Sequence, residues 1–118
     1  YVIGNNDMHL KNFSMIRTDF GWELSPAYDL LNVKIILPND TDDTALLLGG
    51  KKKNFSKVYF DRFGKGLQLN VKQIDAVYHK LTNWLPKALT LIDQSFLNQQ
   101  NREKYKKIVL DRVQLLLH

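Results

Sequence analysis

The chain contains 118 residues, of which 44% are hydrophobic and 25% charged, and its formal net charge is +5. This composition provides one compact core, so it argues against a second independent domain and against a mainly disordered chain. No apolar run approaches the roughly 18 to 20 residues of a membrane-spanning helix, and there is no cysteine for disulfides or thiolate metal sites. We expect a single domain over residues 1–118, no membrane partner and a cytoplasmic location.

The first predicted element is a β-hairpin. Residues Phe13–Arg17 and Trp22–Leu24 are β-formers or neutral, and the Thr18–Gly21 segment between them has turn chemistry that ends in glycine. Pro26 ends the second strand, because proline cannot donate a hydrogen bond to the strand ladder. The chain continues toward Asn32–Ile36, where a short helix and a short strand fit equally well.

The middle of the chain predicts loops and one further strand. Asp40, Asp42 and Asp43 lie in a polar stretch, but their spacing lacks the glycine and glutamate of an EF-hand calcium loop. We expect this stretch to be a solvated loop. Residues Thr44–Leu48 then predict a short strand that ends at Gly49-Gly50.

The second half of the chain predicts helices. Ser56 is placed to cap a helix over Lys57–Phe63 that the following glycines end, and Asn70 is placed to cap the next helix. Pro86 is expected to kink or restart that second helix, because proline lacks the amide hydrogen that a helix interior uses.

A last helix follows residues 98–101. Its apolar side chains recur on one face, and most of its charged side chains, including Arg112, are expected on the opposite, polar face. With one hairpin and several helices, the predicted fold class is mainly α, in an α+β arrangement.

Residues 4–12 concentrate polar and charged side chains just before the first predicted strand. Asp7 and Asn12 have the Asp-x-x-x-x-Asn spacing of a protein-kinase catalytic loop, in which the aspartate accepts the proton of the substrate hydroxyl and the asparagine holds a divalent cation. A hairpin that leaves Asn12 and returns over a similar length brings Asp29 back beside it. Because magnesium takes hard oxygen ligands, typically only one or two of them from protein, Asn12 and Asp29 form a candidate magnesium site.

A purely structural interpretation of the same residues is open on spacing alone. Asp7 and Asn12 are common turn residues, Lys11 can be a solvated charge, and Asp29 can cap a helix that begins after Pro26. Short motifs carry a real false-positive risk, so the spacing by itself does not decide between a site and two turns.

Two longer motifs resemble a known family. Residues 5–14 are Asn-Asn-Asp-Met-His-Leu-Lys-Asn-Phe-Ser, and residues 24–31 are Leu-Ser-Pro-Ala-Tyr-Asp-Leu-Leu. They resemble the catalytic motifs of HipA-like serine/threonine kinases, Asp-x-His-x-Lys-Asn-Phe-Ser and Leu-x-Pro-x-Tyr-Asp. The motifs occur in the right order with a predicted hairpin between them, which is far more specific than either motif alone.

The resemblance implies a site, cofactors and partners. The implied roles are catalytic base for Asp7, Mg²⁺ ligands for Asn12 and Asp29, and contacts in the ATP site for His9, Lys11 and Tyr28. Members of the family transfer the ATP γ-phosphate to a protein Ser or Thr, with aminoacyl-tRNA synthetases among the substrates. They are toxins that a HipB-like helix-turn-helix antitoxin neutralises, and a contact between the basic surface and DNA in the antitoxin complex is compatible with that role.

The sequence also departs from ordinary protein kinases. Asn5-Asn6 stands where His-Arg precedes the base, and Tyr28-Asp29-Leu30 lacks the glycine of Asp-Phe-Gly. The chain has no Gly-rich phosphate loop, no strand with a nucleotide-pairing lysine and no partner glutamate, all of which kinases place upstream. Because it also begins at Tyr1 rather than at a methionine, we expect a fragment: a kinase-like helical C-terminal lobe, without its nucleotide-binding lobe and inactive alone.

One alternative of a different class is kept. The lysines at positions 51–53 and the basic last helix give an isoelectric point near 9.5, and a basic face can attract nucleic acid through phosphate contacts. In that interpretation the chain is a non-catalytic helical module that binds nucleic acid or a partner protein.

Overall fold

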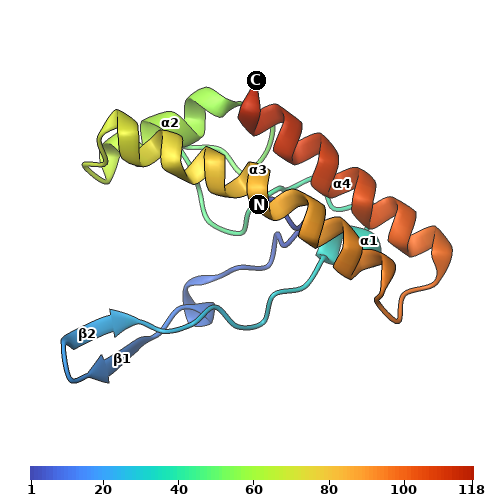
Figure 1. The fold of residues 1–118 in the computed structure, drawn as a ribbon, viewed down its shortest axis with the longest axis horizontal. Helices are drawn as coiled ribbons and strands as arrows, with labels where there is room; N and C mark the ends of the chain where they lie inside the picture. The colour runs from blue at the N-terminus through green and yellow to red at the C-terminus, as the bar shows by residue number, and fades with distance from the viewer.

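Two long helices, α3 (Val71–Asp93) and α4 (Gln99–Leu117), lie side by side and antiparallel (Figure 1). The computed structural model describes all 118 residues. The core lies between these helices, where Ile92, Val109 and Val113 are buried against one another. Half-buried side chains pack around this cluster, namely Val2, Leu81, Trp84, Leu85, Tyr105 and Leu117. The apolar stripes predicted for the two helices therefore face each other.

Asn70 caps α3 as predicted, whereas Ser56, which was expected to cap the helix at Lys57, makes no side-chain cap hydrogen bond. The Asn70 side chain accepts a hydrogen bond from the Gln73 backbone N–H at 3.0 Å, and the Gln73 side chain accepts from the Asn70 N–H at 2.9 Å. This reciprocal pair is a capping box, which satisfies two donors that the first turn leaves free. At α4 the Asn98 side chain accepts from the Asn101 N–H at 2.9 Å.

Pro86 lies inside α3, and the helix continues through it without a restart. Proline removes the hydrogen bond that its own N–H would donate, and its ring crowds the carbonyl four residues earlier. The helix continues because apolar residues on both sides of Pro86, among them Leu81 and Ile92, pack against the same partner helix.

Helix α2 (Lys57–Gly66) is longer than predicted, since it includes both glycines that were expected to end it. Gly64 is buried against Ile74 of α3, and a Cβ at this position would lie 3.0 Å from the isoleucine side chain. The Tyr78 hydroxyl donates to Asp61 at 2.6 Å and ties α3 to α2. Burial, together with this hydrogen bond, raises the pKa of Tyr78 above its ordinary value.

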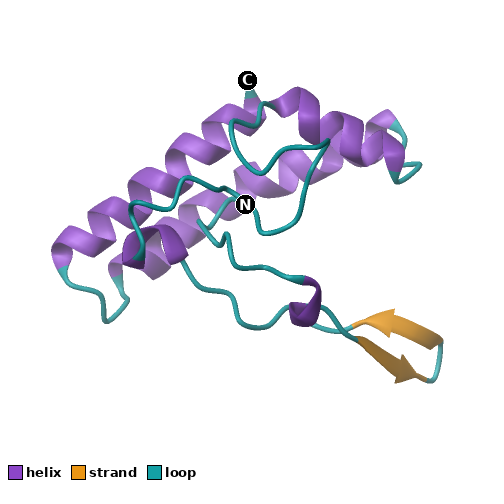
Figure 2. Ribbon diagram, turned by 180° about the vertical axis from the view of Figure 1, so that it is seen from behind, coloured by secondary structure: helices purple, strands orange, loops and turns teal.

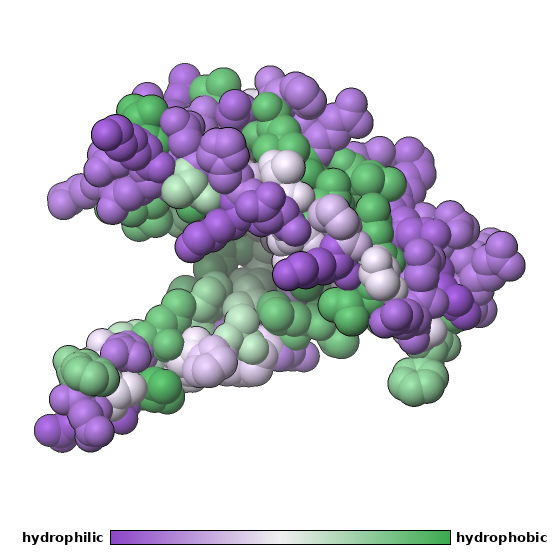
Figure 3. Space-filling view, viewed as in Figure 1, coloured by the Kyte–Doolittle hydropathy of each residue, from purple (hydrophilic) through white to green (hydrophobic).

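The predicted hairpin is confirmed, with slightly shifted bounds: β1 (Met15–Thr18) pairs antiparallel with β2 (Gly21–Leu24). It lies at the end of an arm that projects from the helical body (Figures 1 and 2). Apolar side chains on this arm are open to solvent, and Phe20 at its tip is 95% exposed. Figure 3 shows a hollow between the arm and the body.

The segments after the hairpin settle two open points. Residues Val33–Ile36 form a short helix, α1, which the Asn32 side chain caps by accepting from the Ile35 N–H at 3.2 Å. The strand predicted at Thr44–Leu48 is wrong, because the only β-type contact there is an isolated bridge between Leu48 and Lys51. Gly49 and Gly50 both have positive φ, the conformation of a tight two-residue turn, and they connect the two bridged residues.

The fold is thus mixed, with four α-helices and a two-stranded antiparallel sheet. None of the helices combines the length and the apolar composition that crossing a membrane would require.

Candidate active site

The hairpin brings Asn12 and Asp29 together, as its length predicts. Asn12 belongs to a single 3₁₀ turn, Leu10–Asn12, directly before the arm, and its side chain is almost fully buried. The Asn12 Nδ2 donates to the Asp29 Oδ2 at 2.8 Å, across 17 residues of sequence. The two predicted cation ligands are therefore in direct contact.

The segment Tyr28-Asp29 is tied to the first motif and contains one unusual backbone conformation, at Asp29. The Tyr28 hydroxyl donates to the Lys11 carbonyl at 3.1 Å, which gives a second link between the two motifs. Asp29 has φ +53°, in the left-handed region that few residues other than glycine occupy. Such strain persists only where surrounding contacts hold it, and it is concentrated at functional sites.

Asp7, the predicted catalytic base, lies beside His9 rather than beside Asn12 and Asp29. The Asp7 Oδ1 lies 2.9 Å from the His9 Nε2, and both side chains are about half exposed. Neither side chain contacts Asn12 or Asp29. The Lys11 side chain is exposed and makes no polar contact within the chain, so the structure does not join it to the other predicted residues.

The two asparagines before Asp7 are buried, although no local pattern had singled them out as contacts. Asn5 is 5% exposed and Asn6 is 7% exposed. The Asn5 Oδ1 accepts from the Asp7 backbone N–H at 3.0 Å, while its Nδ2 donates to the Asp29 carbonyl at 3.3 Å. The Asn6 Nδ2 donates to the Asp40 carboxylate at 2.8 Å.

The environment of the Asn12 Oδ1 bears on whether Asn12 and Asp29 can hold a cation. The Asn12 Oδ1 is buried and has no hydrogen-bond donor. A buried carbonyl oxygen without a donor is costly unless something else satisfies it, and this one lies on the same amide that contacts the Asp29 carboxylate. The nitrogen of this amide faces the carboxylate, but amide and carboxylate oxygens are the hard ligands that suit Mg²⁺, which binds few protein ligands and keeps water or phosphate on its other positions. No group of three or more His, Cys, Asp or Glu residues offers a denser metal site.

The comparison with protein families agrees with these motifs. The family model of the HipA-like C-terminal domain matches residues 1–89, well over half of the chain. The chain belongs to the HipA-like C-terminal domain family. The matched range contains both motifs, the arm and most of α3, whereas α4 lies beyond it. No individual curated protein matches the chain.

In this HipA-like domain a polar cavity of about 340 Å³ opens beside Asp7. Its lining includes Asp40, Asp42 and Lys52. The Asp42 backbone N–H donates to Asp40 at 2.9 Å, and this bond, with a smaller contribution from Asn6, holds the pKa of Asp40 below its usual value. Asp7 therefore borders a cavity lined mostly by polar residues rather than the apolar core.

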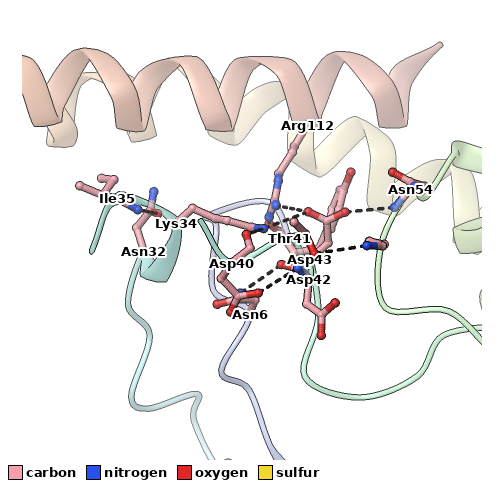
Figure 4. Close-up of polar contacts among 12 residues, drawn as sticks. Asn6, Asn32, Lys34, Ile35, Asp40, Thr41, Asp42, Asp43, Asn54 and Arg112 are labelled. Carbon is pink, nitrogen blue, oxygen red and sulfur yellow. Dashed lines mark hydrogen bonds and ion pairs between the residues drawn. The ribbon is translucent and has the colours of Figure 1, made fainter. Parts of the chain in front are cut away.

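Arg112 of α4 reaches the same region from the helical body (Figure 4). Its guanidinium forms an ion pair with Asp43 at 2.5 Å, donates to the Tyr1 carbonyl and lies over the Tyr1 ring. Lys34 is 3.8 Å from the same Asp43 oxygen, and the Asn54 N–H donates to the other oxygen at 3.3 Å.

This network corrects two predictions. Arg112 is only 9% exposed, so it does not lie on the polar face of its helix, and Asp43 does not belong to a merely solvated loop. A signal was present in the sequence, since Arg112 is three residues after Val109 and four before Leu116, the spacing of one helix face. The prediction placed Arg112 on the polar face because arginine is charged. Its partner Asp43 lies 69 residues away along the chain.

Proposed function

We propose that the chain is the C-terminal lobe of a HipA-like serine/threonine protein kinase, which transfers the γ-phosphate of ATP to a protein hydroxyl. The observation that carries this proposal is the buried contact between Asn12 and Asp29, with the Asn12 Oδ1 left without a donor. It occurs in a chain of the HipA-like family, between the two motifs that resemble the catalytic motifs of its kinases.

The residues have distinct roles in this proposal. Asn12 and Asp29 would hold Mg²⁺ through their side-chain oxygens, and the ion, when bound, would offset charge on the ATP phosphates. Asp7 would orient the substrate hydroxyl and accept its proton, which requires a carboxylate open to an incoming chain. The half-exposed position of Asp7 at the rim of a polar cavity supports that role.

Three further residues complete the proposed ATP site. Tyr28 would fix the turn that presents the Mg²⁺ ligand, and its bond to the Lys11 carbonyl supports this. The free, exposed ammonium group of Lys11 would contact phosphate oxygens. His9 would contact the substrates or orient Asp7, 2.9 Å from its ring.

The proposal includes the remainder of the kinase and its partners. The Gly-rich loop, the nucleotide-pairing lysine and its glutamate would come from an upstream lobe, so the 118-residue chain alone would be inactive. By the family resemblance, the protein substrate would be of the aminoacyl-tRNA synthetase class, and a HipB-like helix-turn-helix antitoxin would neutralise the kinase in the cytoplasm. The basic surface would be free to contact DNA within that complex.

The test is phosphoryl transfer by the full-length kinase carrying Asp7→Asn or Asp29→Asn. Each variant should lower transfer to a protein substrate at least 100-fold, since a positioned base alone contributes about 10² to 10⁴-fold. Asparagine tolerates positive φ and can still accept from Asn12, so Asp29→Asn should remain folded.

Asp19→Asn is the matched control, because Asp19 is in the hairpin turn and makes no side-chain contact to the site. It should transfer phosphate at the wild-type rate. Thermal unfolding would show whether each site variant is folded. If a folded site variant kept more than a tenth of the wild-type rate, the assigned roles would be wrong.

A further inference from the structure

Asn5 lies between the segment that carries Asp7 and the segment that carries Asp29. Its side chain is 5% exposed, and both ends of its amide are used. The Oδ1 accepts from the Asp7 N–H at 3.0 Å, and the Nδ2 donates to the Asp29 carbonyl at 3.3 Å. These are backbone groups of the two residues to which the proposed function gives the base and the metal ligand.

Asp29 is consequently held at two points by buried amides. Asn5 binds its backbone carbonyl, and Asn12 binds its carboxylate at 2.8 Å. A residue at φ +53° needs such contacts, because the left-handed conformation is not its preferred one. The carbonyl contact fixes the direction of the peptide plane, while the carboxylate contact fixes the side chain.

We propose that Asn5 is a positioning residue, which holds the peptides of Asp7 and Asp29 in one fixed relation so that the base and the cation site assemble together. This inference rests on the proposed kinase function and adds a residue to it. Asn5 touches no substrate in this account and acts only through Asp7 and Asp29. Residues behind metal ligands commonly change metal affinity 10 to 100-fold when they are altered.

An asparagine suits this task because it carries one acceptor and two donors on a short, stiff side chain. Aspartate has the same shape and keeps the acceptor for the Asp7 N–H, but it offers no donor to the Asp29 carbonyl. Serine is too short to make both contacts and adds no charge. Asn5→Asp removes the donor to Asp29 but keeps the shape and the acceptor, whereas Asn5→Ser shortens the side chain without adding charge. Comparing the two variants therefore distinguishes loss of the Asp29 contact from loss of side-chain volume.

The experiment measures Mn²⁺ affinity, with Mn²⁺ as the probe of the magnesium site, by electron paramagnetic resonance of the free ion in the presence of ATP. Asn5→Asp and Asn5→Ser should each weaken Mn²⁺ binding about 10 to 100-fold. For Asn5→Asp the direction of the change in Mn²⁺ affinity is diagnostic, because an added negative charge near the site would by itself strengthen cation binding.

Asn32→Asp is the matched control. Asn32 is also buried and close to this segment, but its Nδ2 has no partner and its Oδ1 caps α1. Aspartate keeps that cap, so the control introduces the same buried carboxylate without touching Asp29. It should leave the Mn²⁺ dissociation constant within about threefold of wild type, and thermal unfolding would show that all variants are folded.

Amide hydrogen exchange gives a readout that does not depend on the metal. The Asp7 N–H should stay protected in Asn5→Asp, which keeps its acceptor, and lose protection in Asn5→Ser. If Asn5→Ser, folded, bound Mn²⁺ within twofold of wild type, the positioning role would be wrong while the kinase proposal stood. If the wild-type protein itself failed to bind Mn²⁺ at Asn12 and Asp29, the proposed function would fail first and this inference with it.

Discussion

The helical body and the N-terminal segment are ordered by different forces. The buried hydrophobic side chains all lie between residues 55 and 116, whereas four of the five buried polar residues are asparagines in the first 32 residues. Apolar burial stabilises the body but does not fix the orientation of individual groups, whereas each buried amide fixes the orientation of the groups it binds. The difference teaches that the candidate site is placed by directional hydrogen bonds, while the body supplies the stability.

Arg112 is the fifth buried polar residue and the only one from the body. It links the two regions through Asp43 and the Tyr1 carbonyl. Because α4 lies outside the range that the family model matches, this link is made by a part of the chain beyond the HipA-like match.

The largest expected effect comes from breaking that link. Arg112→Met leaves the Asp43 carboxylate half buried without its main cation, and losing one partner of a buried pair costs about 3 to 5 kcal/mol. Urea denaturation should show a fall of this size in the free energy of unfolding.

Lys107→Met on the same helix is the comparison variant, since Lys107 pairs with Asp111 at an exposed position. It should change stability little. An Arg112→Met protein as stable as Lys107→Met would show that the two regions are not joined by this residue.

A smaller effect is expected from the core of the body. Val113→Ala removes two methyl groups from one of the two most deeply buried side chains, at a cost of about 2 to 3 kcal/mol with the cavity included. Denaturation should report that loss, while Mn²⁺ affinity of the folded protein should remain at the wild-type value. A loss of affinity comparable with that of Asn5→Ser would contradict the division between body and site.

The smallest effect is expected at the tip of the arm. Phe20 is 95% exposed, so Phe20→Ser should change the free energy of unfolding by less than about 0.5 kcal/mol. Thermal unfolding of the two proteins should coincide. A loss above about 1 kcal/mol would mean that the arm packs against the body in solution.

The features that the sequence predicted well are local or follow from chain geometry. The cap at Asn70 depends on a partner three residues away, and a hairpin whose arms are similar in length returns Asp29 to the neighbourhood of Asn12. The strand expected at Thr44–Leu48 is absent, because that segment has no neighbouring strand and pairs only through the single Leu48–Lys51 bridge.

The contacts of Asn5, Asn6 and Arg112 could not be predicted, for a physical reason. Each binds a partner far along the chain, 24 residues away for the Asn5 bond and 34 for the Asn6 bond. Local pattern carries no information about such partners, so an asparagine in a loop looks the same whether it is buried or solvated. For Arg112 the helix-face spacing indicated burial, but nothing local indicated that its partner lies 69 residues away.

The most direct test of the central claim is a titration of the isotope-labelled 118-residue protein with Mn²⁺, with and without ATP, followed by paramagnetic broadening of backbone NMR signals. The claim predicts selective broadening at Asn12 and Asp29 at lower Mn²⁺ concentrations than in the acidic segment Asp40–Asp43. Broadening confined to Asp40–Asp43, with Asn12 and Asp29 unaffected, would contradict a cation site between the two motifs.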